Sequence, residues 1–349
     1  MHGTALTERQ ASILRCIIQE YVGGGRAVAS QALIERYPLN VSSATVRNEM
    51  AALERMGLIQ QMHTSAGRVP TDKGYRYYVE HFAADSALPV HDQVMIRHQF
   101  GQVESHLDRW MELAASVLSE FTRNVSLVTS PRTSVPRLRH FELLSLQERA
   151  ALLILVTQES SVHQALMHLS EPMSQAELSL IADRLNDLLR DSSAAEAETL
   201  IGDLHGAAKV VAERVVRMLQ SAQTSGGAEL HYNGLEHALQ QPEFSSSQAS
   251  AQLFELLRGG ALLSELLPQV SAPTAERPEE NVYIFIGDEN ASQGLRPFGI
   301  VVATYGVDAE VTGLLGILGP RRMPYERTIS SVRYVASLMS DLMRDLYRA

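Results

Sequence analysis

The residues whose types and spacing best suit a chemical role lie on one face of a helix that the sequence predicts to begin at Ser42 or Ser43. A serine side chain there can accept a hydrogen bond from a free N–H of the first turn, and Gly57 can end the helix in a left-handed conformation. Val46, Met50 and Leu53 recur at helical spacing and predict one buried stripe. The opposite face carries small or hydrogen-bonding side chains: Ala44, Asn48, Ala51 and Arg55, flanked by Thr45 and Arg47.

Such a face suits the major groove of duplex DNA, which admits a helix whose outward side chains are short or hydrogen-bonding. Asn48 has the amide geometry to pair with adenine, and Arg47 or Arg55 can donate to guanine or to a phosphate. Ala44, or the methyl group of Thr45, can contact a thymine methyl. The alternative interpretation of this helix alone is an ordinary amphipathic helix with a solvated outer face.

The elements around this helix favour the DNA-binding interpretation. Helical patterns at Thr7–Tyr21 and Gln31–Arg36 precede it, and Gly23, Gly24 and Gly25 separate the two. Three helices with short breaks are typical of a helix-turn-helix, in which the last helix reads the bases. The segments 58–62 and 68–70 predict a β-hairpin, or wing, that can place Arg68 against phosphate or in the minor groove. Thr71 then caps a closing helix that runs to Phe82.

Two blocks of the chain resemble the HrcA family of heat-inducible transcription repressors. The first comprises SSATVRNEM, LERMGLI and HTSAGRVPTDKGYRYYV, all between Ser42 and Val79. The second comprises IGDEN at Ile286–Asn290 and GILGPRRMPYERTISSV at Gly316–Val332. The DNA-binding residues predicted on the reader helix and the wing are Ser43, Ala44, Thr45, Arg47, Asn48, Arg55, His63, Thr64, Ser65, Arg68 and Lys73.

The resemblance implies a sequence-specific repressor of heat-shock chaperone operons of the groE/dnaK type, relieved on heat shock. It implies an inverted-repeat CIRCE operator in double-stranded DNA, a homodimer, and the GroE chaperonin as the partner that keeps the repressor active. Twofold symmetry by itself predicts an inverted-repeat operator, because each subunit reads one half-site.

The rest of the chain predicts a multidomain α+β protein. We expect a winged helix-turn-helix at 1–83, a linker at 84–91, and an α+β domain at 92–190 and 279–349, which the resemblance makes GAF-like. Residues 191–278 are expected to form an inserted, mainly helical domain, and the resemblance implies that it helps the protein dimerise. One long helix is expected from His91 to Phe121, and its broad apolar face packs either on a second subunit or only on its own domain.

Composition limits the possible classes of protein. The net charge of −10 argues against nucleic acid, but residues 1–80 hold nine Lys and Arg against seven Asp and Glu, so the acidic charge lies elsewhere. A net +2 predicts modest DNA affinity for one copy, which a dimer increases. The single cysteine fits a reducing cytoplasm, and we expect a cytoplasmic protein. No run of about 18 apolar residues predicts a membrane span, and no secretory signal is visible.

We expect no enzyme, no cofactor and no metal site, because no catalytic or metal-binding arrangement is visible in the sequence. The twelve histidines show no metal-ligand spacing. Arg321, Arg322 and Met323 follow a predicted turn at Gly319-Pro320, and they either close a ligand site or fix a corner of the fold. The alternative function is therefore a winged-helix regulator that responds to a small molecule bound in the GAF-like domain.

Overall fold

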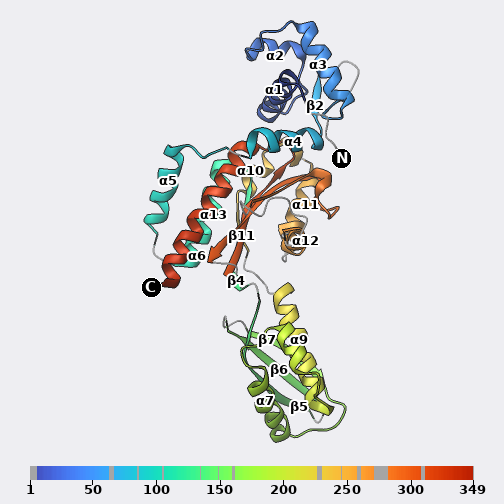
Figure 1. Ribbon diagram of the computed structural model, residues 1–349, viewed down its shortest axis with the longest axis vertical. Helices are drawn as coiled ribbons and strands as arrows, with labels where there is room; N and C mark the ends of the chain where they lie inside the picture. The colour runs from blue at the N-terminus through green and yellow to red at the C-terminus, as the bar shows by residue number, and fades with distance from the viewer. Residues whose placement is uncertain are drawn as a thin grey trace. The chain divides into compact units, whose positions relative to one another are not determined.

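The chain folds into two compact units, shown in Figure 1. The computed structural model describes residues 6–62, 67–84, 86–103, 106–133, 135–147, 149–158, 162–225, 230–244, 246–257, 261–270, 282–307 and 311–348. The larger unit comprises Met1–Ser130, Glu229–Gly306 and Gly313–Ala349. The smaller unit comprises Pro131–Ala228 and Val307–Thr312.

The N-terminal part of the larger unit is a winged helix-turn-helix, as predicted. Its helices are α1 (Glu8–Gly24), α2 (Ser30–Arg36), α3 (Ser43–Arg55) and α4 (Asp72–Tyr78), and α4 continues as a π-helical turn, Val79–Ala83. Strands β1 (Ile59–Gln61) and β2 (Arg68–Pro70) pair antiparallel and form the wing. Thr7 and Thr71 cap α1 and α4 through hydrogen bonds from Gln10 N and Gly74 N, which confirms both predicted helix starts.

The single long helix expected from His91 to Phe121 is wrong. The structure has two helices, α5 (Val90–Gly101) and α6 (Leu107–Thr122). Helix α5 ends at a glycine, which has a low helix propensity. The two helices also differ in burial: α5 buries only Ile96 and Phe100, whereas α6 buries nine residues along its length.

The core of the larger unit is a six-stranded sheet with the strand order β8-β3-β11-β10-β9, and β4 (Arg132–Thr133) pairs with the start of β11. The other strands are β3 (Val125–Thr129), β8 (Leu230–Asn233), β9 (Val282–Ile286), β10 (Phe298–Val307) and β11 (Val311–Pro320). Every residue of β3 is buried, because helices cover both faces of the sheet.

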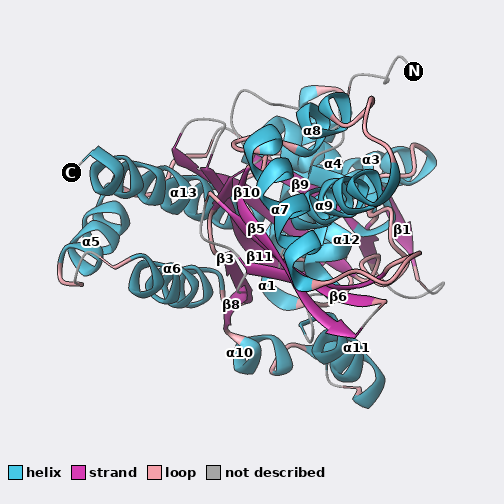
Figure 2. Cartoon of the chain, turned by 90° about the horizontal axis from the view of Figure 1, so that it is seen from below, coloured by secondary structure: helices cyan, strands magenta, loops and turns pink. Residues whose placement is uncertain are grey.

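Helices α6 and α13 (Tyr325–Arg348) cover one face of the six-stranded sheet, and α10 (Leu235–Leu239), α11 (Ser247–Leu257) and α12 (Ala261–Val270) cover the other (Figures 1 and 2). On the second face, Val125 and Leu127 of β3 join a core cluster with Leu253 and Leu266. On the first face, Ser126 Oγ donates to Ala115 O of α6 at 2.6 Å. A sheet between two helical layers is consistent with the expected GAF-like domain.

The smaller unit is built on a separate three-stranded antiparallel sheet. Strands β5 (Leu138–Gln147), β6 (Ala150–Thr157) and β7 (Val162–His168) pair only with one another in the described chain. Helices α7 (Gln175–Leu189), α8 (Ala194–Leu200) and α9 (Gly206–Ser225) bury one face of this sheet. Ser174 and Ser193 cap α7 and α8, each with a glutamate three residues on.

The inserted unit therefore has other boundaries than the expected 191–278. It comprises Pro131–Ala228 and Val307–Thr312, and it includes β5, β6 and β7, which lie in the range 92–190 that was expected for the GAF-like domain. Strand β8 and helices α10 to α12, which were expected in the insert, instead pack on the six-stranded sheet. The physical reason is that an alternating strand pattern shows which face is buried but not which strand is its neighbour. Residues 271–278, the end of the range expected for the insert, lie outside the described residues.

Candidate nucleic-acid interface

Helix α3 is fixed at both ends by local hydrogen bonds. Ser42 is the N-cap, since its Oγ accepts from Thr45 N at 3.1 Å. At the other end Gly57 takes a φ of 74°, and the N–H groups of Gly57 and Leu58 bond to the carbonyls of Glu54 and Leu53 at 2.9 and 3.0 Å. This pair of bonds is a Schellman motif, in which a left-handed glycine closes the helix. The helix therefore has the predicted extent.

The inner and outer faces of α3 also match the prediction. Val46, Met50 and Leu53 are each at most 1% exposed and pack against α1 and α2. The opposite face is exposed at Ala44, Arg47, Asn48, Ala51 and Arg55. Within the described chain the side chains of Arg47 and Asn48 have no hydrogen-bond or ion-pair partner, and Arg55 Nε donates only to Ala51 O of its own helix at 3.4 Å. Their donors are therefore available to a ligand.

The two glutamates of α3 are held at the sides of this face. Glu49 accepts a hydrogen bond from Gln10 Nε2 of α1 at 3.1 Å and lies 3.8 Å from Arg9 Nη1. Glu54 forms an ion pair with Arg68 of β2 at 3.0 Å. Because each carboxylate has a cationic partner, the outer face of α3 presents arginines and an amide with little opposing negative charge. Such a face is suited to a polyanion.

Arg68 lies at the loop end of the wing, where it pairs with Gln61 in the last strand pair before the turn. Its backbone exchanges hydrogen bonds with Val28 at 2.8 and 2.9 Å, and its Nε donates to Glu54. Gly67 stands directly before it, and a Cβ at that position would lie 2.5 Å from Val28 C. The side chain is only 21% exposed, so Arg68 holds the wing against α3 and keeps part of its guanidinium free.

Lys73 and the N-terminal residues of α3 have structural contacts as well as positions near the candidate face. Lys73 Nζ donates to Met56 O at 2.9 Å, where it binds a free carbonyl at the end of α3. Thr45 Oγ1 lies 2.9 Å from Ser42 Oγ. Ser43 is half-buried beside these residues. The remaining predicted contacts, His63, Thr64 and Ser65, lie outside the described residues.

The contacts that could not be read from the sequence are those that hold the predicted residues in place. Glu54 was not singled out, although it binds Arg68. Arg321 and Arg322 were expected either to close a ligand site or to fix a corner of the fold, and their partners favour the second role: Arg321 pairs with Asp72, and Arg322 with Glu243 and Val22 O. The sequence showed two charged residues next to a predicted turn. It did not show their partners, because those partners are distant in the sequence.

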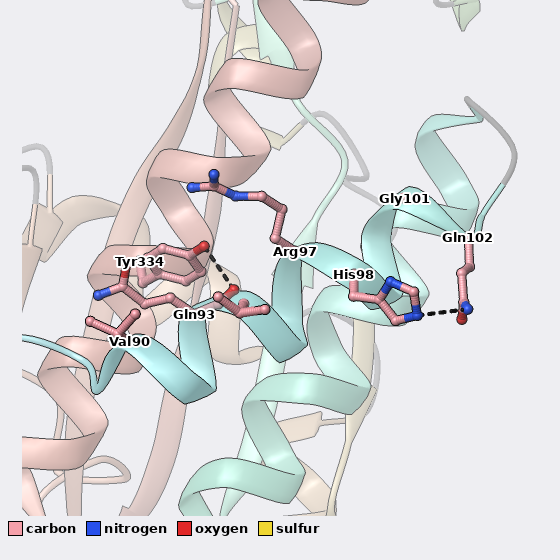
Figure 3. Close-up of a pocket in the computed structure, with 8 residues that line it drawn as sticks. Val90, Gln93, Arg97, His98, Gly101, Gln102 and Tyr334 are labelled. Atoms are coloured by element: carbon pink, nitrogen blue, oxygen red, sulfur yellow. Dashed lines mark hydrogen bonds between the residues drawn. The ribbon is translucent and has the colours of Figure 1, made fainter.

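A groove of about 610 Å³ lies between α5 and α13 (Figure 3). It is lined by Val90, Gln93, Val94, Arg97, His98, Gly101, Gln102 and Tyr334. Tyr334 Oη donates to Gln93 O at 3.0 Å. Arg321, Arg322 and Met323 do not line it, so the structure does not bring them to a ligand site at this groove.

Two other features are absent from the described residues. No group of three or more His, Cys, Asp or Glu side chains there is arranged to hold a metal ion. Among the helices that the structure describes, none is long and apolar enough to span a membrane.

Comparisons with known proteins identify both parts of the chain. Residues 5–81 match the family model "Winged helix-turn-helix transcription repressor, HrcA DNA-binding", and residues 108–329 match "HrcA protein C terminal domain". The heat-inducible transcription repressor HrcA of Thermomicrobium roseum is 47% identical over 98% of this chain and 96% of its own length. The protein of the same name from Herpetosiphon aurantiacus is 41% identical, with the same coverage.

One solved structure has a similar fold over the whole chain. It is a crystal structure of a hypothetical protein at 2.2 Å resolution, with a TM-score of 0.61 and 22% identity. The similarity covers 98% of this chain and 99% of the other. At that identity the similarity concerns the fold alone.

Proposed function

Because this chain belongs to the HrcA family of heat-inducible transcription repressors, we propose that it represses heat-shock chaperone operons of the groE/dnaK type by binding an inverted-repeat CIRCE operator as a dimer. The observation that supports this most directly is the outer face of α3, on which Arg47 and Asn48 are exposed and unpartnered in the described chain. An amide and a guanidinium on a helix of this size suit the base edges of the major groove.

The dimer is supported by an uncovered apolar face on the inserted unit. Leu144, Leu152 and Leu166 are direct cross-strand neighbours on β5, β6 and β7. They lie on the face opposite to the one that the helices bury, and Leu166 is 53% exposed. Val156 and Val162 extend this face along the same strands. Contiguous aliphatic side chains at a sheet surface are typical of a protein interface.

Mutation of this face tests the dimer. Leu144→Glu with Leu166→Glu is expected to convert the protein to a monomer in sedimentation velocity, because each charge would be buried without a partner at the interface. The matched control is Leu180→Glu, which changes a 71% exposed leucine on α7 of the same unit. A double variant that sediments as the unaltered dimer would place the interface elsewhere.

Operator recognition is tested by gel shift with the purified chain at a stated salt concentration. The probes are an inverted-repeat CIRCE duplex, a single half-site and a scrambled duplex of equal composition. We expect the inverted repeat to bind at least about a thousandfold more tightly than the scrambled duplex, the range of specific recognition, with the half-site between them. Equal affinity for all three duplexes would contradict sequence-specific repression.

We propose from the family relationship that the GroE chaperonin keeps the repressor active. Adding chaperonin and ATP to the gel shift should raise the fraction of active repressor and leave the dissociation constant of the active fraction unchanged. Stoichiometric titration with operator separates the two quantities. Release on heat shock then follows from competition, since unfolded proteins occupy the chaperonin.

The alternative, control by a small molecule, depends on the groove between α5 and α13. It predicts a ligand that raises the melting temperature and changes operator affinity with no chaperonin present. A ligand that binds only the native state stabilises it in proportion to the logarithm of its concentration. Thermal shift measurements against a metabolite collection distinguish the two mechanisms of control.

A further inference from the structure

The turn that follows β11 carries two arginines that contact the winged helix. Arg321 Nη1 lies 3.2 Å from each carboxylate oxygen of Asp72, the first residue of α4, and its Nε donates to Arg296 O at 3.1 Å. Arg322 Nη1 donates to Val22 O in the last turn of α1 at 3.1 Å. Its Nη2 donates to Glu243 at 3.0 Å. Both arginines therefore connect the sheet domain to the DNA-binding part.

A third arginine makes the same kind of connection in the opposite direction. Arg76 belongs to α4, and its Nε donates to Glu289 Oε1 at 2.7 Å. Its Nη2 donates to Ile284 O of β9 at 2.7 Å. We call Arg76, Arg321 and Arg322, with their partners Asp72, Glu243, Glu289 and Val22 O, the arginine clamp. None of these residues lies on the outer face of α3.

The fit around Asp72 is close. Asp288 N donates to Asp72 Oδ2 at 3.1 Å. Gly287 has a φ of 57°, and a Cβ at that position would lie 1.9 Å from Asp72 Oδ2. The carboxylate thus occupies the space that glycine leaves open, and it is bound from two directions. A planar guanidinium that donates several hydrogen bonds fixes the direction of its partner as well as the distance.

The clamp is suited to fixing an angle more than to adding stability. The side chain of Arg322 is 15% exposed, but Arg321 is 42% exposed, and water screens ion pairs at such sites. The clamp joins the winged helix to the sheet domain at three points: Arg321 binds Asp72 of α4, Arg322 binds Val22 O at the end of α1, and Arg76 of α4 binds Ile284 O of β9. Attachment at several points resists rotation of the winged helix even where each bond is weak.

We propose that the arginine clamp sets the orientation of each reader helix α3 and thereby the spacing between half-sites that the repressor accepts. This inference rests on the proposed dimer and its inverted-repeat operator. In duplex DNA one added base pair moves a half-site by about 3.4 Å and rotates it by about 34°. A dimer with fixed reader helices cannot follow that change without strain, whereas a dimer with freely rotating reader helices can.

The experiment measures affinity against spacer length. Inverted repeats whose half-sites are separated by the natural spacer, and by one to three base pairs more or fewer, are compared with a single half-site at one salt concentration. One variant combines Arg321→Ala with Arg322→Ala. The other is Glu243→Gln, which removes the charge of the carboxylate that Arg322 binds and leaves all three arginines in place. The matched control is Arg344→Ala, which removes an exposed arginine that pairs with Asp341 at the far end of α13.

We expect the wild type and Arg344→Ala to prefer the natural spacer by at least about tenfold over a change of one base pair, which corresponds to about 1.4 kcal/mol. The double arginine variant should reduce this preference to below about threefold, with half-site affinity within about twofold of the wild type. Glu243→Gln should fall between the two.

Three results would overturn the inference or its premise. A double variant that binds the half-site normally and keeps the full spacer preference contradicts the clamp and leaves the proposed function intact. A wild type that shows no spacer preference contradicts the fixed orientation itself. A wild type that binds an inverted repeat no more tightly than a half-site contradicts the proposed dimeric operator, which is a separate failure. Circular dichroism confirms that each variant is folded before it is compared.

Discussion

The arginines of the reader helix and those of the arginine clamp differ in what their guanidinium groups contact. Arg47 and Arg55 on α3 have no carboxylate partner in the described chain, whereas Arg76, Arg321 and Arg322 each bind one. Two of the three clamp arginines are also largely buried, since Arg322 and Arg76 are 15% and 29% exposed, whereas Arg321 is 42% exposed. An arginine paired inside the protein positions an element, and an arginine left unpaired on a shaped face is available for a polyanion.

The largest expected effect concerns the unpaired arginines. Replacing Arg47 and Arg55 together by alanine should weaken binding to operator and to unrelated DNA alike, because both residues can neutralise phosphates. The slope of log affinity against log salt should become shallower by about 0.9 for each phosphate that is no longer neutralised. Arg109→Ala, an exposed arginine on α6, is the control. A salt slope that equals that of the control would show that the two arginines do not bind the DNA backbone.

The next effect separates base reading from phosphate binding on the same face. Asn48→Ala should lower discrimination between operator and mutated operator by about 1–3 kcal/mol, the contribution of one good amide–adenine pair. Affinity for unrelated DNA should not change, because the amide carries no charge, and unrelated DNA is therefore the internal control. Competition gel shifts measure the ratio. Unchanged selectivity would assign base reading to other residues of α3 or to the wing.

The local features of α3 were predictable from the sequence because their causes lie within a few residues. The Ser42 cap, the Gly57 ending and the stripe of Val46, Met50 and Leu53 all depend on spacing along one helix. The winged helix-turn-helix and the two wing strands followed in the same way. The helix break after Gly101 was missed, since a broad apolar pattern continued through it.

Features that depend on distant partners were not predictable in this way. Arg321 pairs with Asp72, which lies 249 residues earlier in the chain, and nothing in either segment alone indicates the other. Strands β5 to β7 resemble β3 and β10 in composition, yet they form their own sheet and move the boundaries of the inserted unit. The binding of Arg68 to Glu54 and Val28 was not predicted, because these contacts require the folded hairpin.

Arg68 is both paired with a carboxylate inside the protein and close to the candidate DNA-binding face, and it gives the third prediction. Arg68→Ala should weaken binding to all DNA about equally, by roughly 1 kcal/mol, and flatten the salt dependence, as expected when one phosphate loses its cationic partner. Glu54→Ala should act in the opposite direction, because it removes a negative charge and frees Arg68 Nε. Affinity and salt slope are measured for both variants. If both variants weaken binding to the same extent, Arg68 serves only to hold the wing against α3.

The smallest expected effect is on stability, and it concerns the buried tyrosines of α4 beside the arginine clamp. Tyr75 of α4 packs on Tyr325, and its hydroxyl has no hydrogen-bond partner in the described structure. Burial raises the pKa of Tyr75 well above its ordinary value, so this hydroxyl stays neutral at any working pH. Tyr75→Phe should therefore increase the free energy of unfolding by about 1 kcal/mol, because a buried unsatisfied polar group is removed.

Tyr78→Phe is the matched control for this last variant, since it removes a hydroxyl of the same helix that does have a partner. Tyr78 Oη donates to Glu326 Oε1 at 2.8 Å, at the start of α13. Its removal leaves a carboxylate with one bond fewer and should lower stability by about 1 kcal/mol. Urea unfolding should therefore give changes in the free energy of unfolding of opposite sign for the two variants, with operator affinity unchanged in both. That result would show that the packing of α4 against α13 affects stability, whereas the arginine clamp controls the orientation of the winged helix. A Tyr75→Phe protein less stable than the wild type would mean that the Tyr75 hydroxyl makes a hydrogen bond in solution. The packing of α4 on α13 would then include a polar interaction at Tyr75.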